Sequence, residues 1–262
     1  MRTPIFHIDA FTSRPLAGNP AAVMPMLGFP SDAVLQSIAA ENNLGATAFL
    51  VPEADGYRLR WFTPSVEMPL CGHGTLASAA VVMERLQPGR EQVVFQSASG
   101  PLTVHRTGEG YRMNFPARFP KAVRAPWADI SKALGTAPLD VAADGFNYIA
   151  LLSSPQIVRD LQPDMAAIAG LDLDGMIVTA ADDGDFDFVS RYFAPAKGVR
   201  EDPVTGSAHC ALAPYWANRL GKPKFHAAQV SRRGGELTCE LFGDRVELHG
   251  SCVFYLEGMA EI

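Results

Sequence analysis

Apolar and polar residues alternate along several short stretches in the first half of the chain, a pattern of period two that is typical of strands. Two other stretches indicate helices. One begins with the capping pair Ser31-Asp32 and runs to residue 41, and the other begins at Gly72 and runs to residue 86. The first half therefore reads as a strand-rich unit with one long helix. The predicted strands cover residues 5–10, 21–24, 46–51, 57–62, 93–97, 102–106 and 111–115.

The second half repeats this order of elements. The anchor Arg60-Trp61-Phe62, before the first long helix, returns as Arg191-Tyr192-Phe193, 131 residues later. A single structural unit present twice explains the match, and its period is much longer than that of a solenoid repeat. The pattern predicts strands at 146–152, 156–159, 176–180 and 186–193, a short helix at 164–169 and a long helix at 207–220.

The two copies predict two domains. Residues 116–138 contain four prolines and are the expected linker. A last strand at 251–258 has no counterpart in the first copy and would cross back to complete the sheet of the first domain. We therefore expect one domain at residues 1–117, completed by 251–262 where that strand crosses back, and a second at 118–262.

Composition narrows the choice of partner and compartment. The 262 residues carry a net charge of −6 without a cluster of lysines or arginines, which argues against a nucleic-acid partner. No run of 18 apolar residues predicts a membrane span, and Asp9 comes too early for a signal peptide, so we expect a cytoplasmic protein. The four cysteines form no CxxC pair and no metal-ligand spacing.

Each copy contains a candidate anion site where its long helix begins. A strand ends in bulky aromatic residues, a loop follows, and the helix opens near Gly72 in one copy and Gly206 in the other. Unpaired N–H groups and the helix dipole at such a start favour a carboxylate by about 0.3–1 kcal/mol. Two such starts facing each other would hold a small acid from both sides.

Titratable side chains accompany both helix starts. We expect His73 and Asp202 to occupy equivalent loops. An imidazole titrates near pH 6.5, and burial raises the pKa of a carboxyl group, so the pair could take and return a proton near pH 7. The alternative for each is an ordinary helix-terminus role, with His73 bonded to backbone and Asp202 capping the helix.

At these residues the sequence resembles the PhzF-like isomerase family of phenazine biosynthesis, whose duplicated fold is similar to that of diaminopimelate epimerase and proline racemase. The resemblance spans nearly the whole chain. It rests on Asp9-Ala10-Phe11-Thr12, Gly18-Asn19-Pro20-Ala21-Ala22-Val23, Phe62-Thr63-Pro64, Cys71-Gly72-His73-Gly74-Thr75-Leu76-Ala77 and Glu201-Asp202-Pro203-Val204-Thr205-Gly206-Ser207-Ala208.

The resemblance implies an α+β fold of two pseudo-symmetric, barrel-like domains, each wrapped round a central helix, with the site at their interface. It further implies a homodimer, no metal or organic cofactor, and proton transfer on a small carboxylic acid. His73, Asp202 and Ser207 would be the catalytic residues. The substrate would be bound by Asn19, Gly72, Gly74, Thr75, Thr205 and Gly206.

One departure from the family pattern bears on activity. The family usually reads Asn-Leu-Ser-Glu-Thr, and its glutamate is the principal general acid and base. This chain has Asn43-Leu44-Gly45-Ala46-Thr47 instead. Loss of a positioned acid or base typically costs 10²–10⁴-fold in rate. Asp9 or Glu67 would have to reach the site to replace it.

Three functions stay open. The first is an isomerase or epimerase that uses Asp202 with His73. The second is a one-thiol epimerase or dehydratase that uses Cys71, whose counterpart in the second copy is Thr205, so two-thiol racemase chemistry is excluded. The third is a binding or regulatory protein that kept the small-acid site and lost the chemistry.

Overall fold

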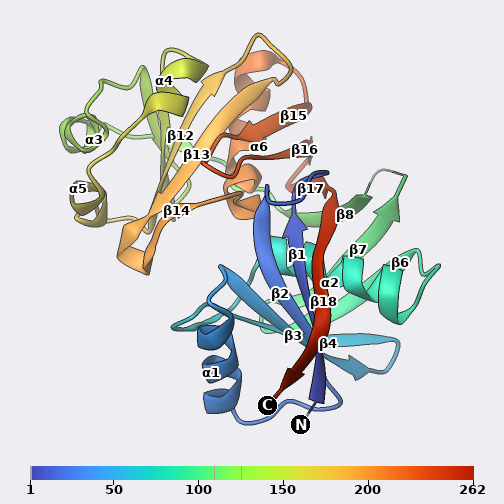
Figure 1. Cartoon of the computed structure of the whole chain (residues 1–262). Coiled ribbons are helices and arrows are strands. Elements are labelled where there is room, and N and C mark those ends of the chain that lie inside the picture. Colours follow the sequence, from blue (N-terminus) through green and yellow to red (C-terminus); the bar gives the residue numbers. More distant parts are fainter. Residues whose placement is uncertain (1, 109, 125) are drawn as a thin grey trace. The chain divides into compact units, whose positions relative to one another are not determined.

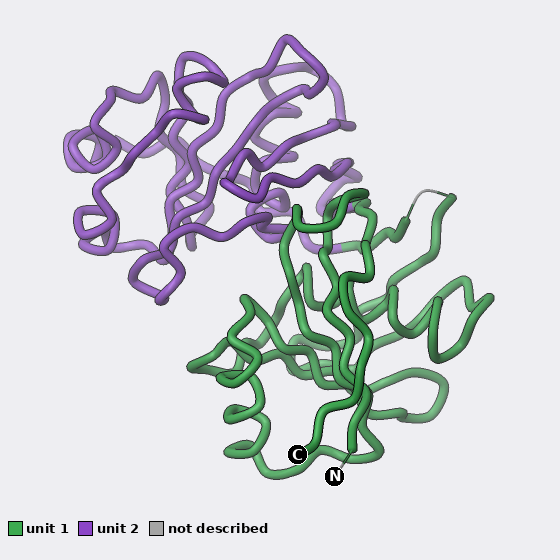
Figure 2. Tube along the Cα trace, viewed as in Figure 1, with its two compact units in different colours: residues 1–114, 249–262 green, residues 115–248 purple. Residues whose placement is uncertain are grey.

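The computed structural model describes residues 2–108, 110–124 and 126–262, and the chain forms two compact units (Figure 2). Unit 1 combines the residues up to 114 with residues 249–262, and unit 2 comprises residues 115–248. The C-terminal segment belongs to unit 1 because its strand β18 (Cys252–Glu261) pairs antiparallel with β1 (Arg2–Ala10). Figure 1 shows the two strands side by side.

Unit 1 is a mixed sheet around one helix. From His73 to Val81 every residue of the central helix α2 (Gly72–Val81) is buried, so the sheet encloses it. A second helix, α1 (Asp32–Asn42), packs Leu35 and Ala39 in an apolar cluster that includes Met24 and Phe49. The remaining strands are β2 (Asn19–Pro25), β3 (Ala46–Glu53), β4 (Gly56–Phe62), β5 (Glu67–Met68), β6 (Gln92–Ser97), β7 (Gly100–Thr107) and β8 (Gly110–Pro116).

Unit 2 is built in the same way around α6 (Gly206–Leu220), which is buried from Ala208 to Trp216. Three short helices, α3 (Trp127–Leu134), α4 (Pro155–Asp160) and α5 (Met165–Ala169), contribute to one apolar cluster with the sheet. The strands are β9 (Lys121–Ala122), β10 (Asp140–Ala143), β11 (Asn147–Leu151), β12 (Gly175–Ala181), β13 (Phe188–Ala194), β14 (Val199–Asp202), β15 (Lys224–Gln229), β16 (Gly235–Phe242) and β17 (Arg245–Gly250).

Strand pairing confirms that one unit occurs twice. In unit 1, β2 is parallel to β3, β3 antiparallel to β4, β4 parallel to β6, and β6 antiparallel to β7. In unit 2, β11, β12, β13, β15 and β16 repeat this series of orientations. The fold is therefore the predicted α+β architecture of two similar sheets, each around a central helix.

The repeated arginines stabilise these units. Arg60 forms ion pairs with Glu67 at 2.7 Å and with Asp32 at 2.9 Å. Arg191 is buried, binds Glu201 at 2.7 Å and donates to the carbonyl of Leu161 at 2.7 Å. The anchors that revealed the duplication are thus structural contacts.

Both central helices depart from a regular α-helix. The last turn of the segment expected at 72–86 is a π-helix, η1 (Val82–Leu86). Inside α6, Pro214 has no N–H to donate to the carbonyl of Cys210, four residues earlier. The N–H of Arg118 bonds to that carbonyl instead, at 2.9 Å, so the proline leaves no buried acceptor without a partner there.

The strand expected at 156–159 is wrong, because these residues belong to α4. Ser154 caps this helix by accepting the N–H of Ile157 at 3.3 Å, and Pro155 occupies its first turn. A serine followed by proline is a helix-start signal that outweighs the local apolar pattern.

Within the described part of the chain, no helix has the length and apolar character needed to cross a membrane.

Candidate active site

The start of α2 is organised by its capping residue, Cys71. The Cys71 Sγ accepts the N–H of Gly74 at 3.4 Å. The Cys71 carbonyl accepts both the N–H of Thr75, at 3.0 Å, and its hydroxyl, at 2.6 Å. The N–H groups of Gly72 and His73 donate to no acceptor among the described residues, so they are the donors that this helix start can offer to a ligand.

His73 is the buried titratable group of this helix start. Its side chain is 8% exposed, and its Nδ1 lies 3.5 Å from the Cys71 Sγ. Burial lowers the pKa of His73 to about 4. The imidazole is therefore neutral at pH 7, and the expectation that it titrates near pH 7 is wrong. A neutral imidazole can still donate one hydrogen bond and accept another.

Position 45 lies beside His73 and Asn19. Asn19 is fully buried at the start of β2. A Cβ on Gly45 would lie 3.5 Å from the Asn19 Oδ1 and 3.8 Å from the His73 Nε2. The next residue, Ala46, is fully buried and pairs with Ala21 of β2. The segment in which the resemblance leads us to expect a glutamate thus adjoins two predicted site residues.

The two carboxylates considered as replacements for the family glutamate have other partners. Glu67 is held by Arg60 through two bonds of 2.7 Å. Asp9 is buried, and its Oδ2 accepts the N–H of Leu16 at 2.8 Å. Neither contact directs a carboxylate toward His73.

The start of α6 presents a second pair of donors. Thr205 is its capping residue, and the N–H of Ala208 bonds to the Thr205 carbonyl at 3.1 Å. The N–H groups of Gly206 and Ser207 donate to no acceptor among the described residues. Ser207 also contributes a half-buried hydroxyl to this helix start.

Asp202 is held beside this helix start. Its Oδ2 accepts the Thr205 hydroxyl at 2.6 Å. Gln229, which sequence reasoning did not identify as a site residue, accepts the Thr205 N–H at 2.8 Å and donates to the Asp202 carbonyl at 2.7 Å. The structure thus brings together Asp202, Thr205, Gly206 and Ser207 and adds Gln229 to them.

His209 supports α6 from inside. It is fully buried, and its Nδ1 donates to the Thr205 carbonyl at 2.9 Å, which leaves Nε2 as the acceptor nitrogen. The ring stacks on Phe188 with centroids 6.0 Å apart. Burial lowers the pKa of His209 to about 4, against the effect of the bond to Thr205.

The expected equivalence of His73 and Asp202 is wrong in detail. His73 is the second residue of α2, and Ser207 is the second residue of α6. Asp202 precedes the capping residue of α6 by three positions, where unit 1 has Met68. The two helix starts therefore carry different chemical groups, an imidazole in one and a hydroxyl with an aspartate in the other.

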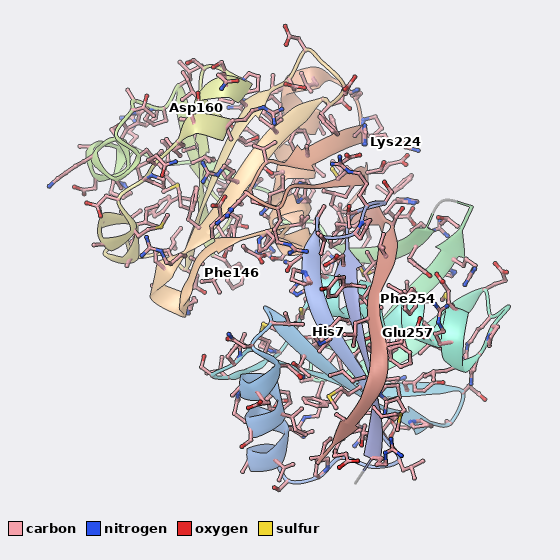
Figure 3. All side chains as sticks on the ribbon, in the orientation of Figure 1. His7, Phe146, Asp160, Lys224, Phe254 and Glu257 are labelled. Carbon is pink, nitrogen blue, oxygen red and sulfur yellow. The ribbon has the colours of Figure 1, made fainter. Side chains whose placement is uncertain are left out.

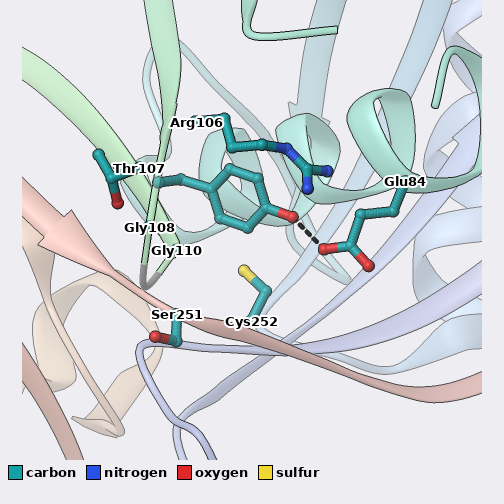
Figure 4. Close-up of a pocket in the computed structure, with 8 residues that line it drawn as sticks. Glu84, Arg106, Thr107, Gly108, Gly110, Ser251 and Cys252 are labelled. Carbon is teal, nitrogen blue, oxygen red and sulfur yellow. Dashed lines mark hydrogen bonds between the residues drawn. The ribbon is translucent and has the colours of Figure 1, made fainter. Parts of the chain in front are cut away.

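A separate cavity of about 260 Å³ lies in unit 1 and includes none of the predicted site residues (Figure 4). Within it, the Tyr111 hydroxyl donates to Glu84, and burial raises the pKa of both Tyr111 and the Cys252 thiol. Both groups are therefore protonated at neutral pH. Its lining consists of Glu84, Arg106, Thr107, Gly108, Gly110, Tyr111, Ser251 and Cys252.

The described residues contain no group of three or more histidine, cysteine or acidic side chains arranged to hold a metal ion.

The fold is similar to that of solved structures of a probable proline racemase and of a hydroxyproline epimerase. A hydroxyproline epimerase from Agrobacterium vitis has this fold: it matches 99% of this chain and 91% of its own with a TM-score of 0.61, at 14% identity.

The family model for phenazine biosynthesis-like proteins, PhzC-PhzF, matches residues 8–258, and the chain belongs to this family. The crystal structure of a PhzF family protein from Enterococcus faecalis matches the whole of both chains with a TM-score of 0.96 at 42% identity. An uncharacterised isomerase from Pseudomonas aeruginosa is 48% identical over 98% of each chain.

Proposed function

We propose that this protein is an isomerase or epimerase that moves a proton on a small carboxylic acid and needs no metal or organic cofactor. The observation that carries the proposal is the pair of helix starts, each with two N–H groups that donate to no described acceptor. Such groups favour a carboxylate. His73 accompanies one pair, and Asp202 with Ser207 accompanies the other.

In the proposed reaction the bound acid is held at the start of α6, where the N–H groups of Gly206 and Ser207 bind its oxygen atoms. The Asp202 carboxylate removes a proton from a carbon next to the unsaturated or carboxylate group, and the electron pair of the broken C–H bond is delocalised onto those oxygen atoms. Asp202 then returns the proton to another carbon on the same face of the acid, as in an isomerase; return to the opposite face of the same carbon, as in an epimerase, requires a second proton donor.

Solvent exchange tests this chemistry before the substrate is identified. The protein is incubated in D₂O with a panel of small unsaturated and hydroxylated carboxylic acids, and deuterium on carbon is measured by NMR. Asp202→Asn should lower the exchange rate by about 10²–10⁴-fold. The matched control is Asp160→Asn, which changes an exposed aspartate on α4 (Figure 3) and should leave the rate unchanged.

The same experiment separates catalysis from binding alone. A small-acid-binding or regulatory protein would show a raised melting temperature with some acid in the panel and no deuterium on carbon. That result, or exchange that persists in Asp202→Asn, would contradict the proposal.

The contact between Cys71 and His73 favours a second candidate, a one-thiol epimerase or dehydratase. The Cys71 Sγ lies at the helix start and 3.5 Å from the His73 Nδ1. Positive helix ends lower the pKa of a thiol. This candidate predicts that iodoacetamide alkylates Cys71 faster than free cysteine at pH 7 and abolishes exchange. Slow alkylation, or full exchange in Cys71→Ser, would eliminate it.

We also propose that the protein is a homodimer, as the family resemblance implies. Five consecutive residues of β18, from Tyr255 to Met259, are exposed, so neither face of this segment is covered within the chain. Tyr255 is 56% and Met259 50% exposed. An exposed strand with apolar side chains is a surface suited to a second copy. Light scattering should give twice the mass of one chain, and Leu256→Glu should give one.

A further inference from the structure

Gln229 ends β15 fully buried, with its side chain at the start of α6. Its Oε1 accepts the N–H of Thr205 at 2.8 Å. Its Nε2 donates to the Asp202 carbonyl at 2.7 Å and to the Thr205 hydroxyl oxygen at 3.1 Å. One buried amide therefore contacts both the capping residue and the loop that carries the aspartate.

These contacts fix the direction of every hydrogen bond in the set. Because the Oε1 of Gln229 faces a backbone N–H, its Nε2 must be the donor toward the Thr205 hydroxyl. That hydroxyl accepts from Gln229, so its own proton is directed to the Asp202 Oδ2, 2.6 Å away. The series of donors thus ends on the carboxylate, and each bond strengthens the next.

We propose that Gln229 and Thr205 are positioning residues that hold Asp202 as a carboxylate in one orientation, so that Asp202 begins the reaction as the base. A donated hydrogen bond stabilises the ionised form of a carboxyl group. The role of base rests on the proposed function, whereas the hydrogen-bonded clamp itself can be tested without a substrate.

Two other polar residues near Asp202, Tyr192 and Glu201, have hydrogen-bond partners of their own. Tyr192 lies opposite Asp202 in the pairing of β13 with β14, and its hydroxyl donates to the Asn147 Oδ1 at 3.1 Å. Burial, assisted by the charge of Asp202, raises the pKa of Tyr192 to about 12. Glu201 is held by Arg191. The further charged groups that act on Tyr192 are Arg118, Asp144 and Asp174.

The described residues of unit 1 form no corresponding clamp. Its capping residue is Cys71 in place of Thr205, and the position of Asp202 is occupied by Met68. Gln96, near the end of β6, is exposed. The capping hydroxyl and the buried glutamine thus accompany the aspartate in unit 2, which links both of them to Asp202.

The pH titration of the Asp202 side-chain carbon tests the clamp directly. The protein is labelled with ¹³C-aspartate, and the Asp202 resonance is assigned by its loss in Asp202→Asn. In Thr205→Val the titration midpoint should lie about one pH unit or more above that of the wild type, because the hydroxyl donor is lost. Gln229→Met should move it in the same direction by less.

Two variants serve as controls. Thr205→Ser keeps a hydroxyl and should keep the wild-type midpoint. Thr75→Val removes a buried hydroxyl from the other helix start, where it donates to the Cys71 carbonyl, and should also leave the Asp202 midpoint unchanged. A Thr205→Val midpoint equal to that of the wild type would overturn the clamp. If Thr205→Val does not fold, an unchanged Asp202 midpoint in Gln229→Met would overturn the clamp instead.

The titration and the exchange experiment test the clamp and the proposed function independently. A raised midpoint in Thr205→Val together with no deuterium exchange in the wild type supports the clamp and contradicts the isomerase. Wild-type exchange together with an unmoved midpoint supports the isomerase and overturns the clamp.

Discussion

Ala46 stands where the family resemblance leads us to expect a glutamate, and it offers a test by gain of function. It is fully buried at the start of β3, next to the glycine that lies close to His73. Ala46→Glu would place a carboxyl group there, with a pKa raised by burial toward the range useful for proton transfer. We expect deuterium exchange on carbon to become faster by about 10²-fold or more.

Size alone must be excluded as the cause of such a gain. Ala46→Gln adds the same number of atoms without a titratable proton and should not accelerate exchange. Ala48→Glu places a carboxyl group at an equally buried position two residues along β3 and should only destabilise the protein. If Ala46→Glu is no faster than Ala46→Gln, position 46 is not where the reaction needs a proton carrier.

Close packing around Gly74 leaves no room for a side chain at this position. A Cβ there would lie 2.7 Å from the Trp61 Cδ1 and 3.1 Å from the Cys71 Sγ. Alanine favours a helix over glycine by about 1 kcal/mol, but overpacking a fixed core costs about 1–3 kcal/mol. We expect Gly74→Ala to destabilise the protein in urea titrations, whereas Gly28→Ala, with open space around it, should be nearly neutral.

Sequence reasoning predicted the candidate residues at the two helix starts but missed a contact that depends on strand register and burial. Gln96 and Gln229 each lie at or near the end of the strand that follows a central helix. However, Gln96 pairs with Arg58, whose counterpart Val189 pairs with Ala228, one residue before Gln229. A shift of one residue turns a strand side chain to the opposite face, so only Gln229 is buried. No pattern in one copy alone reveals that difference.

At the scale of elements, the two central helices share a way of starting. In each, the fourth residue after the capping residue bonds to the capping carbonyl: the Thr75 hydroxyl at 2.6 Å in α2 and the His209 Nδ1 at 2.9 Å in α6. Both side chains are fully buried. The starts of the helices were predictable from glycine and loop signals. The shared bond to the capping carbonyl was not, because a threonine makes it in one helix and a histidine in the other, so no common sequence pattern marks it.

Strand β18 completes the sheet of unit 1, although it lies more than 130 residues after the rest of that unit in the sequence. It pairs with β1 along the length of that strand, and Phe254 packs edge-on against Phe6. Arg85 lies over the Phe254 ring at 3.9 Å and binds Glu257 at 2.6 Å; both partners lie on β18 (Figure 3). Deleting residues 252–262 would leave β1 without this partner and remove the ring that packs against Phe6.

We therefore expect the deletion of residues 252–262 to abolish the cooperative unfolding of unit 1, measured by hydrogen exchange with mass spectrometry. Protection of the peptides from β1 and β2 should be lost. Deletion of residues 261–262 alone removes only an exposed end and should preserve that protection. Equal protection in both truncated proteins would show that β18 is dispensable for the fold of unit 1.

At the scale of the whole molecule, the two buried histidines, one in each unit, make stability depend on pH. Burial lowers the pKa of His73 and of His209 to about 4, against an ordinary value near 6.5. Between these values the unfolded chain binds protons that the folded chain does not. Stability is therefore independent of these groups above pH 6.5 and falls as the pH decreases from 6.5 to 4, by up to about 3 kcal/mol for each histidine.

Carboxylates also titrate near the lower end of this window, so the histidine contribution is measured as a difference between variants. Urea titrations at pH 7 and pH 5 give the loss of stability for each protein. His73→Gln and His209→Gln should each lose less between the two values than the wild type does, because one proton-binding group of the unfolded chain has been removed. A wild-type loss that persists in both buried variants would mean that these imidazoles take up protons in the folded chain as readily as in the unfolded one, and His73 would then be protonated near neutral pH and able to donate that proton.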